Sequence, residues 1–199
     1  MQDANQDHRL ARVTGATGAI GKAIALEIAQ QPGYRVKLLC RDSHKAEKAV
    51  SEIIEHSGNQ RVSFDVVDVS SKESIAAVAQ RLKKPVHVLV NNAAITPRYR
   101  QSKQANRMLT VAFAKRLREH GVTVNACHPG DVNSNLSNKL GFGGHESPFD
   151  GARTPAWLAT DEIGQRETGK YFEHKQMRRC RYGEDSEGVE ALYQACLAF

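Results

Sequence analysis

Apolar runs of strand length alternate with stretches of helical period from the N-terminal end of the chain onward, and no other feature limits the possible folds as strongly. This alternation is typical of a parallel β-sheet whose strands are joined by crossover helices, so we expect an α/β fold. The chain has 199 residues, the size of one substantial domain. We therefore expect one domain over residues 1–199.

The expected elements can be placed along the chain by their period and their punctuation. We expect strands at Leu10–Thr14, Arg35–Cys40, Arg61–Val67, Val86–Val90 and Val122–Ala126, and a last edge strand at Gly169–Glu173. We expect helices at Ala19–Gln31, from Asp42 or Ser43 onward, and at Lys72–Leu82, Gln101–His120, Thr154–Thr160 and Glu187–Ala198. Gly121 predicts the end of the long fourth helix. Beyond it, residues 131–150 are expected to form a loop.

Composition and charge exclude several classes of protein. The apolar fraction of 40% fits a globular chain, and no stretch is long and apolar enough for a membrane span. Four dispersed cysteines suggest neither a disulfide framework nor a metal site, so we expect a reduced, cytoplasmic protein. The net charge is +6, but its only dense run, at residues 175–181, is more typical of a solvated face or a small-phosphate contact than of nucleic-acid binding.

A glycine-rich turn lies where the first strand passes into the first helix. Its glycines are Gly15, Gly18 and Gly21, within Thr14-Gly15-Ala16-Thr17-Gly18-Ala19-Ile20-Gly21. At such a junction the backbone N–H groups and the helix dipole can hold a pyrophosphate, and the glycines permit the tight turn and the close approach of the ligand. A structural turn uses glycine too, but the strand-turn-helix context favours a dinucleotide site.

The end of the second strand bears on the choice of nucleotide. An acidic residue there accepts hydrogen bonds from the adenosine ribose of NAD(H), whereas an arginine can hold the 2′-phosphate of NADP(H). This chain has Cys40 and Arg41 at that position, with Asp42 adjacent. The sequence therefore favours NADP(H), with NAD(H) as the second option.

Four separated segments resemble the short-chain dehydrogenase/reductase family, and within it the retinol-dehydrogenase-like carbonyl reductases. They are the glycine turn, Asp68-Val69, Asn91-Asn92-Ala93-Ala94 and Tyr99-Arg100-Gln101-Ser102-Lys103; His128-Pro129-Gly130 with Val132 and Ser134 adds a fifth likeness. The resemblance implies a three-layer, doubly wound parallel sheet of the Rossmann type. It also implies these cofactor-binding residues: Gly15, Thr17, Gly18, Ile20, Gly21, Arg41, Asp68, Val69, Asn91, Ala93, Pro129, Gly130, Val132 and Ser134.

Tyr99 and Lys103 are four residues apart, so on a helix they share a face. An ammonium group beside a phenol favours phenolate, and we expect it to lower the pKa of Tyr99 from about 10. The resemblance implies that Tyr99 protonates a carbonyl oxygen while Lys103 also holds the ribose hydroxyls. Taken alone, a tyrosine four residues before a lysine is usually a helix surface pair.

The chain departs from the family between Asn92 and Tyr99, where only residues 93–98 stand. The family has a long helix there and a central strand that ends at its catalytic serine, so we expect this chain to lack one central strand and one helix. No residue here can be assigned the role of that serine or of the family's relay asparagine; Ser102 is not its equivalent. A shortened isoform or gene model, an omitted internal segment and a compact natural variant all explain the gap.

The resemblance implies an NADP(H)-dependent oxidoreductase that interconverts a carbonyl and an alcohol on a small, lipophilic substrate, with residues 135–149 contributing to substrate selection. The alternative is a catalytically inactive nucleotide-binding or interaction protein. Family members commonly dimerise through the missing helix and the helix that carries the tyrosine. A homo-oligomer is therefore an option, but with an incomplete interface.

Overall fold

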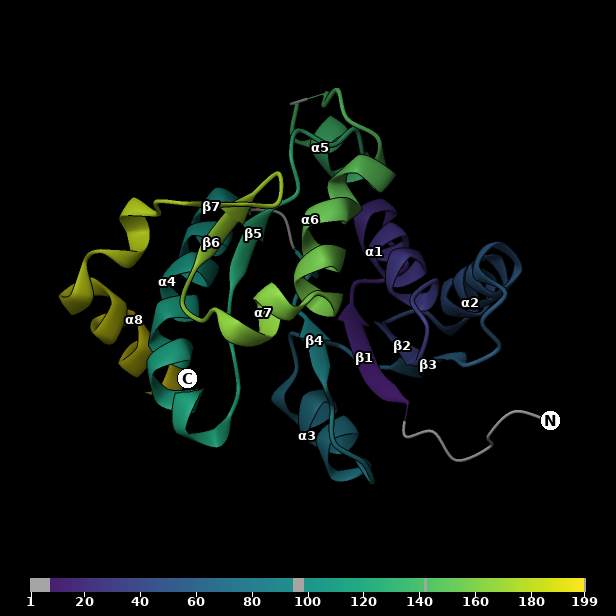
Figure 1. Cartoon of the computed structure of the whole chain (residues 1–199), viewed down its shortest axis with the longest axis horizontal. Coiled ribbons are helices and arrows are strands. Elements are labelled where there is room, and N and C mark those ends of the chain that lie inside the picture. The colour runs from purple at the N-terminus through teal and green to yellow at the C-terminus, as the bar shows by residue number, and fades with distance from the viewer. Residues whose placement is uncertain (1–7, 95–98, 142, 199) are drawn as a thin grey trace. The chain divides into compact units, whose positions relative to one another are not determined.

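The computed structural model describes residues 8–94, 99–141 and 143–198 (Figure 1). These residues group into two compact units. The first unit combines residues 1–93 with 131–152, and the second combines residues 94–130 with 153–199. The single domain expected over residues 1–199 stays a prediction.

The first unit contains a four-stranded parallel sheet of the Rossmann type, with the strand order β3-β2-β1-β4. Its elements are β1 (Arg9–Thr14), α1 (Ala19–Ala29), β2 (Tyr34–Cys40), α2 (Ser43–Ser57), β3 (Val62–Val66), α3 (Lys72–Gln80) and β4 (Val88–Val90). Helices α1 and α2 cover one face of this sheet, and α3 lies on the other (Figure 1). The expected α/β alternation is confirmed for this part of the chain.

The core of the first unit lies between the sheet and helices α1 and α2. Alternate strand residues Ala11, Val13, Val36 and Leu38 have no exposed surface, because successive strand side chains point to opposite faces of a sheet. Fully burying a side chain such as Val36 or Leu38 stabilises the fold by roughly 1.5–3 kcal/mol. Asp42 caps α2 by accepting a hydrogen bond from the Lys45 backbone N–H at 3.1 Å, which confirms the expected start of this helix.

The opposite face of the sheet carries a small ionic network around Arg12 in the central strand β1. Arg12 is only 7% exposed, and its Nη1 lies 3.3 Å from Asp65 Oδ2. Lys37, which is paired with Arg12 in register, donates a hydrogen bond to Asp65 Oδ1 at 3.1 Å. The carboxylate of Asp65 therefore compensates two cations in a region where the sequence pattern calls for apolar side chains.

Strand β4 is the last strand of this sheet. Within the described residues it pairs only with β1, and Leu89 in its centre is 55% exposed. This agrees with the expected loss of the strand that would follow it. The next strand, β5 (Ala126–His128), pairs with β6 (Tyr171–Glu173) in a separate three-stranded sheet instead of joining β4.

The second unit is built on the long helix α4 (Tyr99–Leu117), which ends in a short 3₁₀ turn, η1 (Arg118–His120). Gly121 closes it in the left-handed conformation, as expected. The other elements of this unit are β7 (Gln176–Arg178), α7 (Glu162–Arg166), η2 (Arg181–Gly183) and α8 (Ser186–Ala198), with most of α6 (Pro148–Thr160). Helices α4 and α8 contact each other.

Two of the expected strands were misplaced. The strand expected at Val122–Ala126 begins only at Ala126, because the preceding backbone bonds to the segment after α7. The Val124 N–H donates to Thr168 Oγ1 at 3.0 Å, and the Val124 carbonyl accepts from Gly169 N at 2.7 Å. The edge strand expected at Gly169–Glu173 begins only at Tyr171, and as β6 it lies in the middle of its sheet because β7 pairs with it in an antiparallel hairpin.

The loop expected over residues 131–150 was also wrong in part. It contains the short helix α5 (Asn135–Lys139), which Ser134 and Ser137 open by exchanging hydrogen bonds. It also contains the start of α6, which begins at Pro148 rather than Thr154. A proline suits the first position of a helix because its missing N–H has no partner there. Among the described residues, no helix is long and apolar enough to cross a membrane.

Candidate active site

The turn after β1 is too crowded for side chains at two of its three glycines. A Cβ at Gly21 would lie 2.5 Å from the Gly15 carbonyl oxygen and 2.6 Å from Asn92 Nδ2. Gly15 has a φ of +63°, and a Cβ there would lie 3.0 Å from the Ala93 Cα. Only glycine fits either position without a shift of the backbone.

Hydrogen bonds tie this turn to the end of β4. Asn92 Nδ2 donates to the Thr14 carbonyl oxygen at 3.0 Å, and the backbone N–H groups of Asn92 and Ala93 both donate to Thr14 Oγ1 at 3.0 Å. The Thr14 hydroxyl in turn donates to the Val90 carbonyl oxygen at 3.3 Å. The segment 91–93 therefore holds the turn in shape from the neighbouring strand.

The N-terminus of α1 opens from this turn without a side-chain cap. Gly18 occupies the N-cap position with extended backbone, no side chain bonds to it there, and the first turn of α1 contains no acidic residue. Thr17 and Ile20, also expected to contact the nucleotide, flank Gly18 and are partly exposed. Uncapped amides at the positive end of a helix fit a pyrophosphate.

The end of β2 brings Cys40 and Arg41 to the same edge of the sheet. Cys40 is buried, and its thiol lies against Ala16 and Thr17 of the turn; burial raises the pKa of this thiol. Arg41 is exposed. Hydrogen bonds from Ser70 and, to a smaller extent, the charge of Arg41 lower the pKa of Asp68. Val69, next to Asp68, is 42% exposed.

Tyr99 and Lys103 lie one turn apart on α4 in the second unit. Lys103 Nζ is 5.9 Å from the centroid of the Tyr99 ring. The expected lowering of the Tyr99 pKa is nevertheless wrong: burial of the phenol raises this pKa, and the opposing charge that lowers it comes from Arg107. Ser102 donates its hydroxyl to the Tyr99 carbonyl oxygen at 2.8 Å, so it serves the backbone of the helix.

Cys127, in β5, is a neighbour of Lys103 that the sequence did not single out. Burial raises the pKa of its thiol to about 12, and the charge of Lys103 partly opposes this rise. Burial also lowers the pKa of Lys103. Arg107 was missed as well, although its position one further turn along from Lys103 was a visible signal.

The segment after β5 is divided between the two units. Pro129 and Gly130 belong to the second unit, and the Gly130 N–H donates to His128 Nδ1 at 2.9 Å. Val132 and Ser134 belong to the first unit, where Val132 is 5% exposed and pairs with Glu146 in an isolated parallel bridge. Among the expected cofactor-binding residues, the first unit thus contains the turn, Arg41, Asp68, Val69, Asn91, Ala93, Val132 and Ser134.

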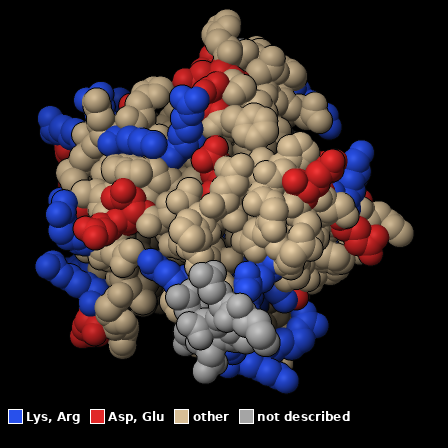
Figure 2. Space-filling view, turned by 45° about the vertical axis from the view of Figure 1, so that its right-hand side comes forward, with Lys and Arg blue, Asp and Glu red and all other residues tan. Residues whose placement is uncertain are grey.

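The described side chains show no grouping of three or more histidine, cysteine or acidic residues that could hold a metal ion. All four cysteines are free thiols. On the face drawn in Figure 2, Asp and Glu side chains lie among the Lys and Arg side chains. The groups available for chemistry are therefore the backbone amides of the glycine turn, the phenol of Tyr99 and the half-buried ammonium group of Lys103.

Comparisons with known proteins agree with this geometry. Residues 9–101 match the family model described as short chain dehydrogenase. The human dehydrogenase/reductase SDR family member 12 is 46% identical over 87 residues, which are 43% of this chain and 27% of that protein. Mouse retinol dehydrogenase 11 is 27% identical over 254 aligned positions, which cover 87% of this chain and 80% of that protein.

Solved structures share the fold at low sequence identity. A putative short chain dehydrogenase from Escherichia coli in complex with NADPH has a TM-score of 0.71 and 19% identity, covering 86% of this chain and all of that one. An actinorhodin polyketide ketoreductase with NADPH has a TM-score of 0.67 and 20% identity, covering 86% of this chain and 97% of that one.

The extent of these matches shows that the relatives contain residues that this chain lacks. The first curated relative named above is matched over only 27% of its length. In the longer match, 254 aligned positions cannot be filled by 199 residues, so mouse retinol dehydrogenase 11 has residues with no counterpart in this chain. The chain is therefore similar to short-chain dehydrogenases over residues 9–101, and it lacks residues that the longer relative contains.

Proposed function

We propose that the chain binds NADP(H) and interconverts a carbonyl and an alcohol on a small, lipophilic molecule. The observation that carries the proposal is the glycine turn, where Gly15 and Gly21 admit no side chain and α1 begins without a cap. The relatives' names support the reaction class, since they include retinol dehydrogenases and reductases with NADPH.

The residues present fit a dinucleotide at this turn. The first amides of α1, beside Thr17, Gly18 and Ile20, would hold the pyrophosphate, and Asp68 with Val69 would contact the adenine. Arg41 would hold the 2′-phosphate, because a guanidinium at the end of β2 suits that group better than the ribose hydroxyl. When bound, the nicotinamide supplies or accepts the hydride.

Tyr99 would provide the proton that the carbonyl oxygen takes up when the carbonyl is reduced to an alcohol. Because burial raises the pKa of Tyr99, its phenol stays protonated at neutral pH and can donate to a carbonyl oxygen. Lys103 is positioned on the same helix face and would orient the phenol and the ribose hydroxyls. This protonation state favours reduction of a carbonyl over oxidation of an alcohol.

Titration of the purified 199-residue chain with NADPH and, separately, NADH tests the nucleotide site. We expect binding that prefers NADPH and that Gly21→Val abolishes. Gly58→Ala, at the end of α2 and outside the turn, is the control for a general loss of stability, because Gly58 has a φ of +71° and a Cβ there would meet nothing within 4 Å. Failure of the unaltered chain to bind either nucleotide would refute the proposal.

A second function is a nucleotide-binding protein without turnover. It is favoured by one observation: only residues 93–98 stand between Asn92 and Tyr99, so no residue can be assigned the family's serine role. Assays of NADPH oxidation with a panel of aldehydes and quinones separate the two functions. Turnover that Tyr99→Phe abolishes supports the reductase, and binding without turnover supports the second function.

The cellular setting and the assembly are also part of the proposal. We infer a cytoplasmic location from the composition of the chain, and we keep a homo-oligomer as an option with an incomplete interface. Fractionation of cells that express the chain, and light scattering of the purified protein, test these two points.

A further inference from the structure

Three arginines and two tyrosines converge in the second unit, and the proposed reaction uses none of them directly, although the charge of Arg107 acts on Tyr99. They are Arg107 of α4, Tyr171 of β6, Arg178 of β7, and Arg181 and Tyr182 of η2. We refer to these five residues as the arginine-tyrosine cluster. They come from α4 and from the C-terminal segment of the same unit, where α4 contacts η2.

The two tyrosine rings hold the guanidinium groups by their faces. Arg107 Cζ lies 4.4 Å from the centroid of Tyr171 and 5.9 Å from that of Tyr182. Arg181 Cζ lies 4.9 Å from the centroid of Tyr182, and its Nη2 donates to the Tyr182 hydroxyl at 2.9 Å. Arg178 is the cross-strand partner of Tyr171 in the β6–β7 hairpin.

The charges in this cluster are not compensated by the described part of the chain. There, none of its three arginines has a carboxylate within ion-pair distance. Arg178 donates instead to the amide oxygen of Gln176 at 2.6 Å. The adjacent carboxylate, Glu173, accepts a hydrogen bond from the Tyr171 hydroxyl at 2.5 Å.

Arg179 shows the contrast within the same basic run. Its guanidinium makes two hydrogen bonds to the carboxylate of Glu184, at 2.6 and 2.7 Å. Arg179 and Glu184 therefore form a bidentate pair within this segment. Arg107, Arg178 and Arg181 lack this pairing and therefore retain N–H groups for an external anion.

The stacking also limits what kind of anion fits. A guanidinium group carries five N–H donors in a planar fork, and the donors that are not bonded within the chain suit the oxygens of a phosphate. Tyr171 is buried and Tyr182 half-buried, and both rings are already in contact with arginines, so they offer poor platforms for stacked nucleic-acid bases. Arg178 and Arg181 are exposed, so an anion can reach the cluster.

We propose that the arginine-tyrosine cluster binds a phosphate group, carried by a soluble phosphorylated molecule or by the head group of an anionic phospholipid. The site is independent of the nucleotide turn, which lies in the first unit. The proposal therefore does not depend on the proposed oxidoreductase function.

Calorimetric titration of the full chain with inorganic pyrophosphate, and sedimentation with phosphatidylcholine vesicles with and without phosphatidic acid, test the site. Arg107→Gln and Arg181→Gln should each weaken binding by about tenfold or more, since each variant loses charge-assisted hydrogen bonds to the anion. Arg179→Gln removes the same charge from the same segment and should leave binding within about twofold. Because Arg181 is exposed, its variant should fold even if Arg107→Gln does not.

The outcomes separate the ligand sources and the competing site. Binding of pyrophosphate alone assigns a soluble phosphate, whereas binding to the phosphatidic acid vesicles that exceeds binding of pyrophosphate assigns a lipid head group. The proposal is overturned if neither probe binds, or if Arg179→Gln weakens binding as much as Arg181→Gln does. Pyrophosphate binding that Gly21→Val abolishes and Arg181→Gln leaves intact would place the anion on the nucleotide turn and would likewise overturn the proposal.

Discussion

Asn92 donates its side-chain amide to the carbonyl oxygen of Thr14 at 3.0 Å and thereby fastens the end of β4 to the end of β1. Asn92→Ala removes this donor and leaves a partly buried carbonyl with fewer partners. We expect a loss of about 1–2 kcal/mol in the free energy of unfolding, measured by urea denaturation. Asn91→Ala is the control, because Asn91 is exposed. Equal losses in the two variants would contradict the role given to Asn92.

Arg41 should set the preference between the two nucleotides. Arg41→Ala removes the only guanidinium expected at the 2′-phosphate, so we expect the affinity for NADPH to fall about tenfold or more while that for NADH changes little. Fluorescence titration with both nucleotides measures the two affinities. Arg61→Ala, which removes another exposed arginine of the same unit, should change neither.

The direction of the reaction should depend on pH through Tyr99. Burial raises the pKa of Tyr99 above its ordinary value of about 10, so the protonated phenol persists through the neutral and mildly alkaline range. We expect carbonyl reduction to stay flat there and to decline only at more alkaline pH, whereas alcohol oxidation should increase as phenolate forms. Initial rates in both directions across pH test this. A decline of the reduction rate near pH 7 would show that Tyr99 is not the proton donor.

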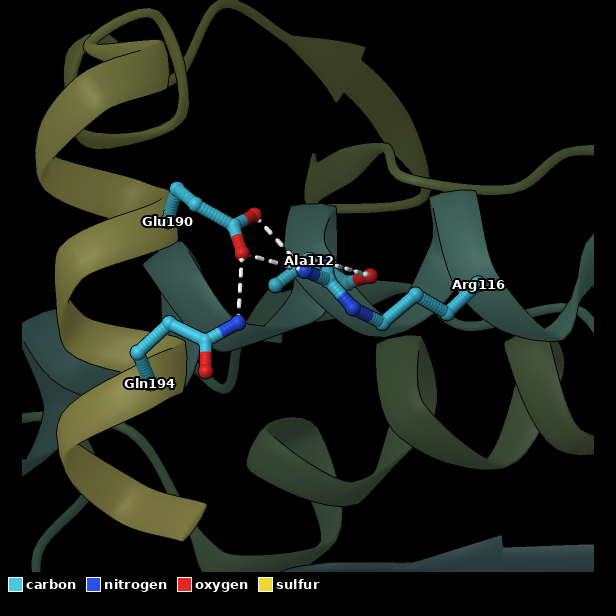
Figure 3. A network of polar contacts seen from close by, with 4 residues as sticks. All are labelled: Ala112, Arg116, Glu190 and Gln194. Carbon is cyan, nitrogen blue, oxygen red and sulfur yellow. Dashed lines mark hydrogen bonds and ion pairs between the residues drawn. The ribbon is translucent and has the colours of Figure 1, made fainter. Parts of the chain in front are cut away.

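The contact between α4 and α8 should weaken in acid. Arg116 donates to both carboxylate oxygens of Glu190 at 2.6 Å, and Gln194 donates to the same carboxylate at 2.9 Å (Figure 3). The hydrogen bond from Arg116, the largest cause, lowers the pKa of Glu190. Because this pKa is lower in the folded than in the unfolded chain, the stabilisation is present above the unfolded value and is lost as pH falls through the folded value.

Glu190→Gln should therefore lower the midpoint of thermal unfolding at pH 7 and leave it unchanged at a pH below the folded pKa of Glu190. Calorimetry at the two pH values measures this difference. Glu187→Gln, on the same helix, should have little effect at either pH, since among the described residues the ion pair to Arg116 is made by Glu190 and no ion pair is made by Glu187. A Glu190→Gln effect of equal size at both pH values would show that charge is not its cause.

The four thiols should differ in reactivity. The thiol of Cys127 is partly exposed but has its pKa raised to about 12 by desolvation, and Cys40 is buried with a raised pKa, whereas Cys196 is exposed. Since the thiolate is the reactive form, iodoacetamide at pH 7.5 should label Cys196 well before Cys127 and Cys40. Mass spectrometry of labelled peptides follows the order, and labelling in urea should remove it. Equal rates at Cys127 and Cys196 in the folded chain would contradict this account.

The first half of the fold could be predicted from the sequence because each local signal agrees with the tertiary structure. Asp42 caps the helix that follows it, and the alternating apolar residues of β1 and β2 face the helices. The second half is different, since its backbone bonds depend on distant residues. Nothing near Val124 indicates that its N–H pairs with Thr168 instead of a neighbouring strand.

Strand β7 could not be predicted from the sequence, because its three residues are all exposed and therefore show no alternation of buried and exposed side chains. Its hairpin turn uses His174 and Lys175 at positive φ, where asparagine and glycine are the usual signals. The pKa of Tyr99 could not be predicted from spacing either. The distance to Lys103 is compatible with a lowered value, but burial in the folded unit outweighs it.

The first unit is assembled from two stretches of chain, residues 1–93 and 131–152. A ribosome therefore releases all four strands of its sheet before it has synthesised Val132 and its partner Glu146. The glycine turn and the hydrogen bond from Asn92 to Thr14 can form during synthesis. Residues 131–152, which complete the unit, emerge only after α4 and β5. Nascent chains halted just before residue 131 should therefore already contain the parallel sheet, with β4 as an edge strand.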